Sequence, residues 1–195
     1  MSQTVLITGA SNGIGKACAR VFARKGYDLV LVARHREKLE AVKAELSEYD
    51  VQIKVIAMDL TGEDAAVDLY NNLVLDDISI DILVNNAGFG DHGAFHDSSW
   101  EKQKKMVLLN IVALMQMTYV FGQSMKRRKK GRILNVASIA GLCAGPYMST
   151  YYATKAFVLS FSESIDYELK DYNVEVSCLC PGPTKTGFMD VANLG

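Results

Sequence analysis

A tyrosine and a lysine four residues apart are the side chains in this 195-residue sequence best suited to proton chemistry. They are Tyr151 and Lys155, and on a helix this spacing places them one turn apart on the same face. A nearby ammonium group favours the phenolate, so it lowers the pKa of a tyrosine from about 10 towards the working pH. Tyr151 could then give a proton to a carbonyl oxygen or take one from an alcohol. The same spacing occurs by chance on surface helices, so the pair needs support from the rest of the chain.

A glycine-rich segment near the N-terminus provides a first sign of nucleotide binding. It lies between an apolar run and a helical pattern, where glycines allow a tight turn and where the helix N-terminus attracts a pyrophosphate. A purely structural turn is the alternative, but this position favours a dinucleotide. The residues expected to contact the cofactor here are Gly9, Ser11, Asn12, Gly13, Ile14 and Gly15.

The end of the second apolar run favours NADP(H) over NAD(H). An NAD-binding domain usually has an acidic side chain there to hold the ribose hydroxyls, whereas this chain has Ala33 followed by Arg34. A guanidinium group suits the 2′-phosphate of NADP(H). The alternative is a surface arginine at the start of a charged helix. We predict that Arg34 lies in the cofactor site and that the cofactor is NADP(H).

Apolar runs alternate with helical patterns along the whole chain, which is typical of a parallel sheet covered by helices. Strands are expected at residues 5–7, 29–32, 53–57, 82–84, 133–136 and 174–179. Helices are expected at residues 14–25, 37–48, 63–75 and 99–125, and from Tyr151 to about residue 171. The predicted fold class is α/β: a Rossmann-type, doubly wound parallel sheet in three layers, forming a single domain over residues 1–195. We expect odd and even helices on opposite faces.

Composition and charge argue against several other classes of protein. Nearly half of the residues are apolar and the formal net charge is −1, which is ordinary for a soluble globular domain and does not favour nucleic acid. We recognise no signal peptide and no apolar run approaching the length of a membrane span, so a cytoplasmic location is expected. The four cysteines lack metal or redox spacing, so we expect buried free thiols and no metal site.

Two smaller features leave two interpretations each. His92 and His96 follow the fourth strand, where they could touch a substrate or be ordinary loop residues, and they lack a third metal ligand. The basic run at residues 126–130 is either a solvated helix end that complements the helix dipole or a landing site for an anionic carrier or substrate.

The methionines Met106, Met115, Met117 and Met125 are interpreted as helix packing, possibly at a subunit interface.

With these residues assembled, the whole sequence closely resembles the short-chain dehydrogenase/reductase family. The motifs occur in the family's order: Thr8-Gly9 with Gly13-Ile14-Gly15, Asp59-Leu60, Asn85-Asn86-Ala87-Gly88, Asn110, Ser138, Tyr151 with Lys155, and Pro181-Gly182. The runs at residues 152–157 and 180–184 look like a bacterial, NADP(H)-dependent branch. The ordered set is far more specific than any one motif.

The resemblance implies a role for each catalytic residue. Tyr151 matches the general acid/base, and Lys155 would hold the nicotinamide ribose and depress the pKa of Tyr151. Ser138 would hydrogen-bond the substrate oxygen. Asn110 would hold a water that links Lys155 to solvent. Tyr152 points about 100° away from Tyr151 around the helix, so we interpret it as packing.

The resemblance also implies further cofactor contacts. Asp59 would lie near the adenine amino group, with Leu60 beside the ring. The segment Asn86, Ala87 and Gly88 would lie under the adenosine ribose. The residues that would border the nicotinamide are Pro181, Gly182, Thr184 and Thr186.

Family members normally continue with a substrate-covering segment, another helix and a seventh strand. We therefore expect this sequence to be incomplete at its C-terminus. In the family the long helix and the Tyr151 helix commonly pair between subunits, which predicts a homo-oligomer, either a dimer or a tetramer.

The leading hypothesis is an NADP(H)-dependent enzyme that reduces a ketone or aldehyde, or oxidises a secondary alcohol. One alternative is a 3-oxoacyl thioester reductase that uses the basic run as a dock for a carrier protein. The other is a non-catalytic module that senses NADP(H). A sensor has no use for the set of Asn110, Ser138, Tyr151 and Lys155, so that set favours an enzyme.

Overall fold

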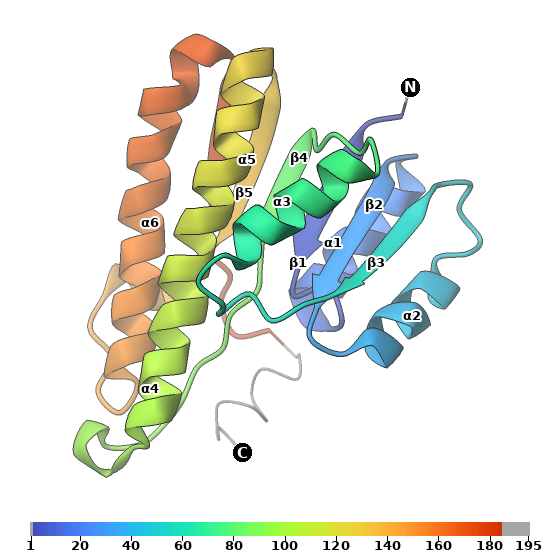
Figure 1. Ribbon diagram of the computed structural model, residues 1–195. Helices are drawn as coiled ribbons and strands as arrows, with labels where there is room; N and C mark the ends of the chain where they lie inside the picture. The colour runs from blue at the N-terminus through green and yellow to red at the C-terminus, as the bar shows by residue number, and fades with distance from the viewer. Residues whose placement is uncertain (1, 185–195) are drawn as a thin grey trace.

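The computed structural model describes residues 2–184, and its centre is a parallel sheet of six strands (Figure 1). The strands are β1 (Thr4–Thr8), β2 (Asp28–Ala33), β3 (Ile53–Ala57), β4 (Ile82–Asn85), β5 (Gly131–Val136) and β6 (Val174–Leu179). Their order across the sheet is β3-β2-β1-β4-β5-β6. This is the strand order of the Rossmann fold, so the predicted fold class and the positions of the strands are confirmed.

The connections between strands contain the expected helices. The α-helices are α1 (Gly13–Arg24), α2 (Arg36–Glu45), α3 (Ala65–Leu75), α4 (Trp100–Val107), α5 (Leu114–Arg128) and α6 (Ser149–Leu169). Short 3₁₀ turns are η1 (Phe95–Asp97), η3 (Ile139–Leu142) and η4 (Lys170–Tyr172). The single long helix expected at residues 99–125 is present as a continuous helical segment, Trp100–Arg128, in which the π-helical turn η2 (Leu108–Ala113) joins α4 to α5.

The helices divide between the two faces of the sheet, but they do not alternate. α1 and α2 pack on one face, and α3, α5 and α6 pack on the other. The expectation that odd and even helices take opposite faces is therefore wrong. The chain moves outward from β1 to β3, then returns beside β1 and moves the opposite way from β4 to β6. A right-handed crossover changes face only where that direction reverses.

Aliphatic residues on alternate sides of the strands fill the two spaces between sheet and helices. Leu83 and Ile133 lie in the cluster beneath α3 and α5, whereas Ile7 and Leu134 pack with the cluster beneath α1 and α2. Neighbouring residues of a strand point to opposite faces, and both faces are buried along β1, β2 and β4, which explains their nearly continuous apolar runs, whereas β6 is exposed at Glu175, Ser177 and Leu179. Burying each such side chain contributes about 1.5–3 kcal/mol.

One helical segment, Trp100–Arg128, is long and apolar enough to cross a membrane by length and composition alone. The sequence interpretation did not recognise it. In the fold, 44% of its most apolar window is buried, and Met106, Met117, Phe121 and Met125 are almost completely covered. Core packing against the sheet and α6 accounts for part of this apolar character, and it confirms the packing role predicted for Met106, Met117 and Met125, whereas Met115 is 39% exposed.

Candidate active site

The carboxyl ends of β1 and β4 lie side by side where the strand order reverses, and the Thr8 hydroxyl joins them. This hydroxyl accepts hydrogen bonds from the N–H groups of Asn86 and Ala87, both at 3.0 Å, and donates to the carbonyl of Val84 at 3.3 Å. The Asn86 amide donates to the carbonyls of Thr8 and Gly9, at 3.0 and 3.1 Å. The glycine-rich turn and the segment from Asn86 to Gly88 are thereby held as one surface at the switch point, where such folds bind ligands.

The glycine-rich turn has the shape that a phosphate cradle needs. Gly9 and Gly13 have φ angles of +65° and +53°, in the left-handed region that glycine enters without strain. A Cβ on Gly15 would lie 2.3 Å from the carbonyl oxygen of Gly9. α1 begins with no acidic side chain in its first turn, so its positive end remains available to an anion. Ser11, Asn12 and Ile14 lie in this same turn, and the set fits the pyrophosphate of a dinucleotide.

Charged groups gather at the ends of β2 and β3. One carboxylate oxygen of Asp59 accepts hydrogen bonds from the backbone and the hydroxyl of Thr61, at 3.0 and 2.9 Å. The backbone bond is the main reason that the pKa of Asp59 is lowered, and the positive charges of Arg34 and Lys105 lower it further. Arg34 is exposed. Leu60 is only 6% exposed and packs into the core, so little of its side chain can reach a ligand.

Ser138 and Tyr151 meet at the end of β5. Ser138 lies two residues after the end of β5, Tyr151 lies in the first turn of α6, and their two hydroxyl groups are hydrogen-bonded. The Ser138 oxygen also accepts the N–H of Ala140 at 3.1 Å. Tyr151 is 8% exposed and packs with Phe89 and Met106. The predicted serine–tyrosine pair is therefore within reach of one substrate oxygen.

Lys155 lies behind this pair, and its amine donates a hydrogen bond of 2.7 Å to the carbonyl of Val136. Its nitrogen lies 5.8 Å from the centre of the Tyr151 ring. Burial lowers the pKa of Lys155 to about 8, because a buried ammonium loses its hydration. Burial likewise raises the pKa of Tyr151, and the hydrogen bond from Ser138 lowers it by less. The expectation that Lys155 depresses the pKa of Tyr151 is wrong for this structure, since desolvation of the phenol dominates.

Asn110 lies in the π-helical turn η2 and fastens the loop after β4 to α6. Its amide oxygen accepts the N–H of Phe89 at 3.1 Å, and its amide nitrogen donates to the Phe89 carbonyl at 2.9 Å and to the Thr154 hydroxyl at 3.1 Å. Thr154 in turn donates to the carbonyl of Tyr151 at 2.7 Å. Both amide N–H groups of Asn110 are used. A water link to Lys155 stays a prediction, and it would need the amide oxygen or the backbone of Asn110.

Gly88 brings the cofactor surface against the catalytic groups. A Cβ at Gly88 would lie 3.0 Å from the Asn110 amide oxygen and 3.6 Å from the Lys155 nitrogen. Gly88 itself is exposed. A ligand lying along the segment from Asn86 to Gly88 would therefore reach Lys155.

The segment after β6 closes the other side of Ser138. The Pro181 carbonyl accepts the N–H of Ile139 at 3.1 Å and lies 3.5 Å from the Ser138 hydroxyl oxygen. The Thr184 hydroxyl donates to the carbonyl of Gly182 at 2.9 Å. That these residues border the nicotinamide stays a prediction. Thr186 lies outside the described residues.

The structure adds residues that the sequence interpretation did not assign. Thr8 and Thr154 connect site segments through their hydroxyl groups, as described above. Beneath the site, buried Asn85 and Asn135 are hydrogen-bonded to each other. Asn85 could have been noticed in the sequence, because it directly follows three apolar strand residues and a polar side chain buried there needs a hydrogen-bond partner. Thr8 and Thr154 have no comparable signal in the sequence.

The remaining sequence interpretations have mixed outcomes. Cys143 is exposed, so the expectation of buried thiols is wrong there, whereas Cys18, Cys178 and Cys180 are half-buried. Within residues 2–184, no group of three or more His, Cys, Asp or Glu side chains could hold a metal ion. In the basic run, Arg128 and Lys130 pair with Asp81 at 3.5 and 3.3 Å, which favours the interpretation as a helix end.

The family model of the short chain dehydrogenases matches residues 3–194. The chain belongs to this family. The chain is therefore an oxidoreductase that interconverts CH–OH and C=O groups with a nicotinamide cofactor. The family match confirms the predicted resemblance and the predicted enzyme class.

Two curated relatives show the kinds of protein to which this chain is similar. Nodulation protein G of Rhizobium sp. (strain N33) is 35% identical over 98% of this chain and 77% of its own length. A very-long-chain 3-oxoacyl-CoA reductase of Phaeosphaeria nodorum is 36% identical over 89% of this chain and 52% of its own length.

Two solved structures share the fold closely. A short-chain dehydrogenase from Sphingobium yanoikuyae in complex with NADPH superposes with a TM-score of 0.92 at 37% identity, covering 98% of this chain and 75% of that one. The bulky-bulky ketone specific alcohol dehydrogenase from Comamonas testosteroni superposes with a TM-score of 0.88 at 37% identity, covering 94% and 74%. The predicted cofactor is supported by such complexes with NADPH and NADP.

Proposed function

We propose that this short-chain dehydrogenase reduces a ketone or aldehyde with NADPH, and that Tyr151 is the proton donor. The observation that carries the proposal is the hydrogen bond between the Ser138 hydroxyl and the buried Tyr151 phenol, beside a cradle for a dinucleotide. Burial raises the pKa of Tyr151, so the phenol keeps its proton at neutral pH. A protonated phenol is the form that a reduction requires.

Each catalytic side chain has a distinct task in this mechanism. A bound nicotinamide supplies the hydride in reduction and accepts it in oxidation. Ser138 donates a hydrogen bond to the carbonyl oxygen and stabilises the charge that develops on it. Tyr151 donates its proton to the same oxygen. Lys155 is within reach of a ligand beside Gly88, so it would hold the ribose, and Asn110 keeps the loop around Phe89 in place.

We propose NADPH rather than NADH because of the charges near the end of β2. Arg34 is exposed there, and its charge and that of Lys105 act on Asp59. The exposed guanidinium of Arg34 suits a 2′-phosphate, and Asp59 itself is engaged by Thr61. Replacing Arg34 by alanine should weaken NADPH binding at least tenfold more than NADH binding, measured by fluorescence titration. Equal losses for both cofactors would show that the phosphate is not recognised there.

The two alternative functions remain distinguishable. The thioester alternative is supported by the 3-oxoacyl-CoA reductase among the relatives. The proposed carrier dock is weakened because Arg128 and Lys130 are paired with Asp81, and Arg127 lies 3.4 Å from the Tyr70 hydroxyl. A sensor without turnover would have no need of the bonded Ser138 and Tyr151 hydroxyls.

The molecular setting is also part of the proposal. We infer a cytoplasmic, homo-oligomeric protein in which residues 1–195 contribute a single domain. Exposed apolar side chains line the outer side of the segment from α4 to α5, among them Val112, Met115 and Tyr119. Such a patch suits a contact with a second subunit.

The most direct test is an assay of carbonyl compounds with NADPH, using the full-length protein. Turnover is expected for at least one class of ketone or aldehyde. Ser138→Ala should reduce kcat by a factor of about 100 or more, because a donor to the developing oxyanion is lost. Tight NADPH binding without turnover on ketones, aldehydes or 3-oxoacyl thioesters would instead indicate a binding module.

A further inference from the structure

Two loops that follow different strands meet beside the catalytic tyrosine. One runs from β4 to α4 and the other from η3 to α6, and both extend beyond the carboxyl ends of the strands, at the lower left of Figure 1. The N–H of Gly93 in the first loop donates a hydrogen bond of 2.8 Å to the carbonyl of Tyr147 in the second. The rings of His92 and Tyr147 face each other across this contact, with centres 6.1 Å apart and planes tilted by 39°.

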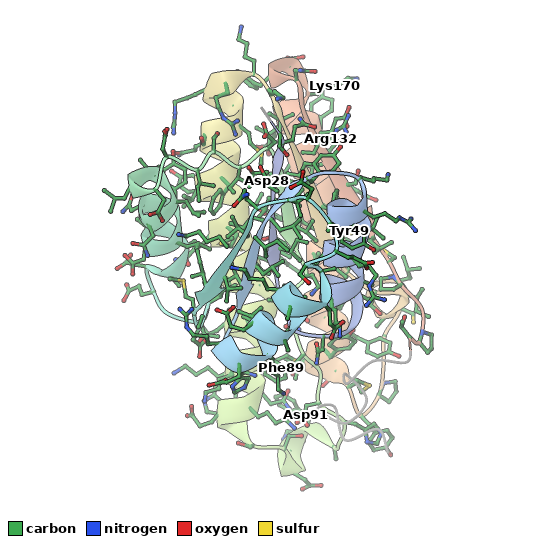
Figure 2. All side chains as sticks on the ribbon, turned by 90° about the vertical axis from the view of Figure 1, so that its right-hand side faces the viewer. Asp28, Tyr49, Phe89, Asp91, Arg132 and Lys170 are labelled. Carbon is green, nitrogen blue, oxygen red and sulfur yellow. The ribbon has the colours of Figure 1, made fainter. Side chains whose placement is uncertain are left out.

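The loop that carries His92 is held at two points. Asp91 is 8% exposed, and its carboxylate oxygens accept hydrogen bonds from Lys102 at 2.5 Å and from Gln103 at 3.0 Å, both on α4. Phe89 is bonded at both backbone groups by Asn110. Figure 2 shows Phe89 and Asp91 at the same end of the molecule, opposite the end marked by Asp28, Arg132 and Lys170. His92 is therefore presented by an anchored loop, although its own side chain is exposed.

Tyr147 has an unusual backbone for its residue type. Its φ angle is +64°, a conformation that costs energy for a residue with a Cβ and that glycine or asparagine would adopt more easily. Its side chain is 63% exposed, so burial in the core does not offset that cost. Backbone strain at an exposed aromatic residue beside an active site is a reason to infer function.

Both residues belong to loops whose neighbouring residues, Phe89 and Met148, pack against Tyr151. Met148, which follows Tyr147, packs in the same cluster as Tyr151 and Phe89. On the far side of Ser138, the η3 side chains Ile139 and Leu142 are 47% and 66% exposed. The surface around the serine–tyrosine pair therefore combines two tilted rings with exposed aliphatic groups.

We propose that Tyr147 and His92 are specificity-determining residues, which hold the ring-bearing, apolar body of a bulky ketone while its carbonyl group lies at Ser138 and Tyr151. This inference deepens the proposed function and rests on it. Two exposed rings on anchored loops offer flat faces to an aryl or alicyclic group, and offset or edge-on ring contacts add to the effect of apolar burial. A flexible straight chain gains less from the same surface, because it must also be ordered on binding.

The test compares two ketones of equal carbon number, one with an aryl or alicyclic ring next to the carbonyl group and one with a straight chain. Tyr147→Asn removes the ring but tolerates the left-handed backbone. We expect this variant and His92→Ala to raise KM for the cyclic ketone by about 5- to 30-fold, the effect of losing one ring contact. For the straight-chain ketone KM should change less than about twofold, and kcat should be retained for both.

Two further variants control for disruption of the loops. Tyr147→Phe keeps the ring and should behave like the wild type, whereas His96→Ala removes an exposed histidine of the same loop and should have no effect. Equal changes in KM for both ketones, or a loss in Tyr147→Phe as large as in Tyr147→Asn, would overturn the inference. If the wild type reduces neither ketone nor any other carbonyl compound, it is the proposed function that fails. If it reduces both and the variants do not discriminate, only the role of these residues is refuted.

Discussion

Lys155 is the residue whose chemistry is changed most by its surroundings. Its amine is enclosed between α6 and the end of β5, where the Val136 carbonyl accepts its hydrogen bond. Burial lowers the pKa of Lys155 to about 8 and raises that of Tyr151. In both cases the neutral form is favoured, because each charged form would lose its hydration. The site therefore holds a protonated phenol ready to act as an acid.

The lowered pKa of Lys155 predicts a specific dependence of stability on pH. Below pH 8 the lysine is protonated in the folded and unfolded states, so the full cost of burying an ammonium is present. As the pH rises from about 8 to about 10.4, the folded state loses its proton first and this cost disappears. The unfolding free energy of the wild type should thus rise relative to that of Lys155→Met over this range, as measured by urea unfolding at about pH 7 and about pH 10. Parallel pH dependences would show that Lys155 titrates normally in the fold.

Residue types and spacing could predict the Tyr151–Lys155 pair, but not the direction in which its pKa values move. The spacing of four on a helix is visible in the sequence, and so is the chemistry of a phenol beside an amine. The direction depends on how deeply α6 packs, because burial is the main cause of both pKa shifts. Such long-range burial leaves no local signal.

At the scale of elements, a buried chain of polar side chains crosses the layers just beneath the site. The Asn85 amide on β4 donates to Thr118 on α5 at 3.1 Å and to Asn135 on β5 at 2.9 Å. Asn135 donates to Ser162 on α6 at 3.0 Å. Asn135 directly precedes Val136, the partner of Lys155. This chain therefore keeps α6 and β5 aligned, and with them the lysine.

Replacing Ser162 by alanine tests the importance of this chain. The change leaves a buried N–H of Asn135 without its partner, which should lower the unfolding free energy by about 1–3 kcal/mol. Ser164→Ala is the matched control, because Ser164 is exposed and its hydroxyl donates to the Ser160 carbonyl one turn earlier on the same helix; it should change stability by less than about 0.5 kcal/mol. Chemical denaturation of both variants measures the difference. Equal stability of the two would mean that the buried chain contributes little.

The elements themselves were largely predictable, since β1, β2 and β4 are buried on both faces and have nearly continuous apolar runs. The π-helical turn η2 was not predictable, because Leu108–Ala113 has the same apolar pattern as an α-helix. Asn110 lies in that turn, so its bonds to Phe89 and Thr154 became visible only in the structure. The glycine-rich turn was predictable, because the need for glycine is visible in the sequence. At Gly15 the carbonyl oxygen of Gly9 lies too close for any side chain.

At the scale of the whole molecule, the direction reversal between β3 and β4 determines which helices share a face. It places α5 and α6 together on the outer part of the sheet, as Figure 1 shows. The prediction that successive helices alternate between the two faces of the sheet failed, because it used the handedness of the crossover connections without the order of the strands. The order itself depends on which strands pair, and periodicity carries no information about pairing.

The exposed apolar side of α5 predicts the behaviour of the molecule in solution. Tyr119 is 67% exposed there, and Tyr119→Glu should shift the protein towards smaller assemblies, since a buried unpaired charge opposes association. Leu75→Glu is the control, because Leu75 is 85% exposed at the end of α3. Light scattering on both variants measures the assembly size. An unchanged size for Tyr119→Glu, or the same change for Leu75→Glu, would place the subunit contact elsewhere.

The central claim is that Tyr151 transfers the proton, and two adjacent tyrosines allow a direct test. Tyr151→Phe removes the hydroxyl that is bonded to Ser138, whereas Tyr152→Phe removes a hydroxyl from a ring that packs against Gly145. With a reducible ketone and NADPH, Tyr151→Phe should reduce kcat by a factor of about 100 or more while the Kd for NADPH changes little. Tyr152→Phe should retain wild-type turnover. Near-normal kcat in Tyr151→Phe, or an equal loss in both variants, would contradict the account.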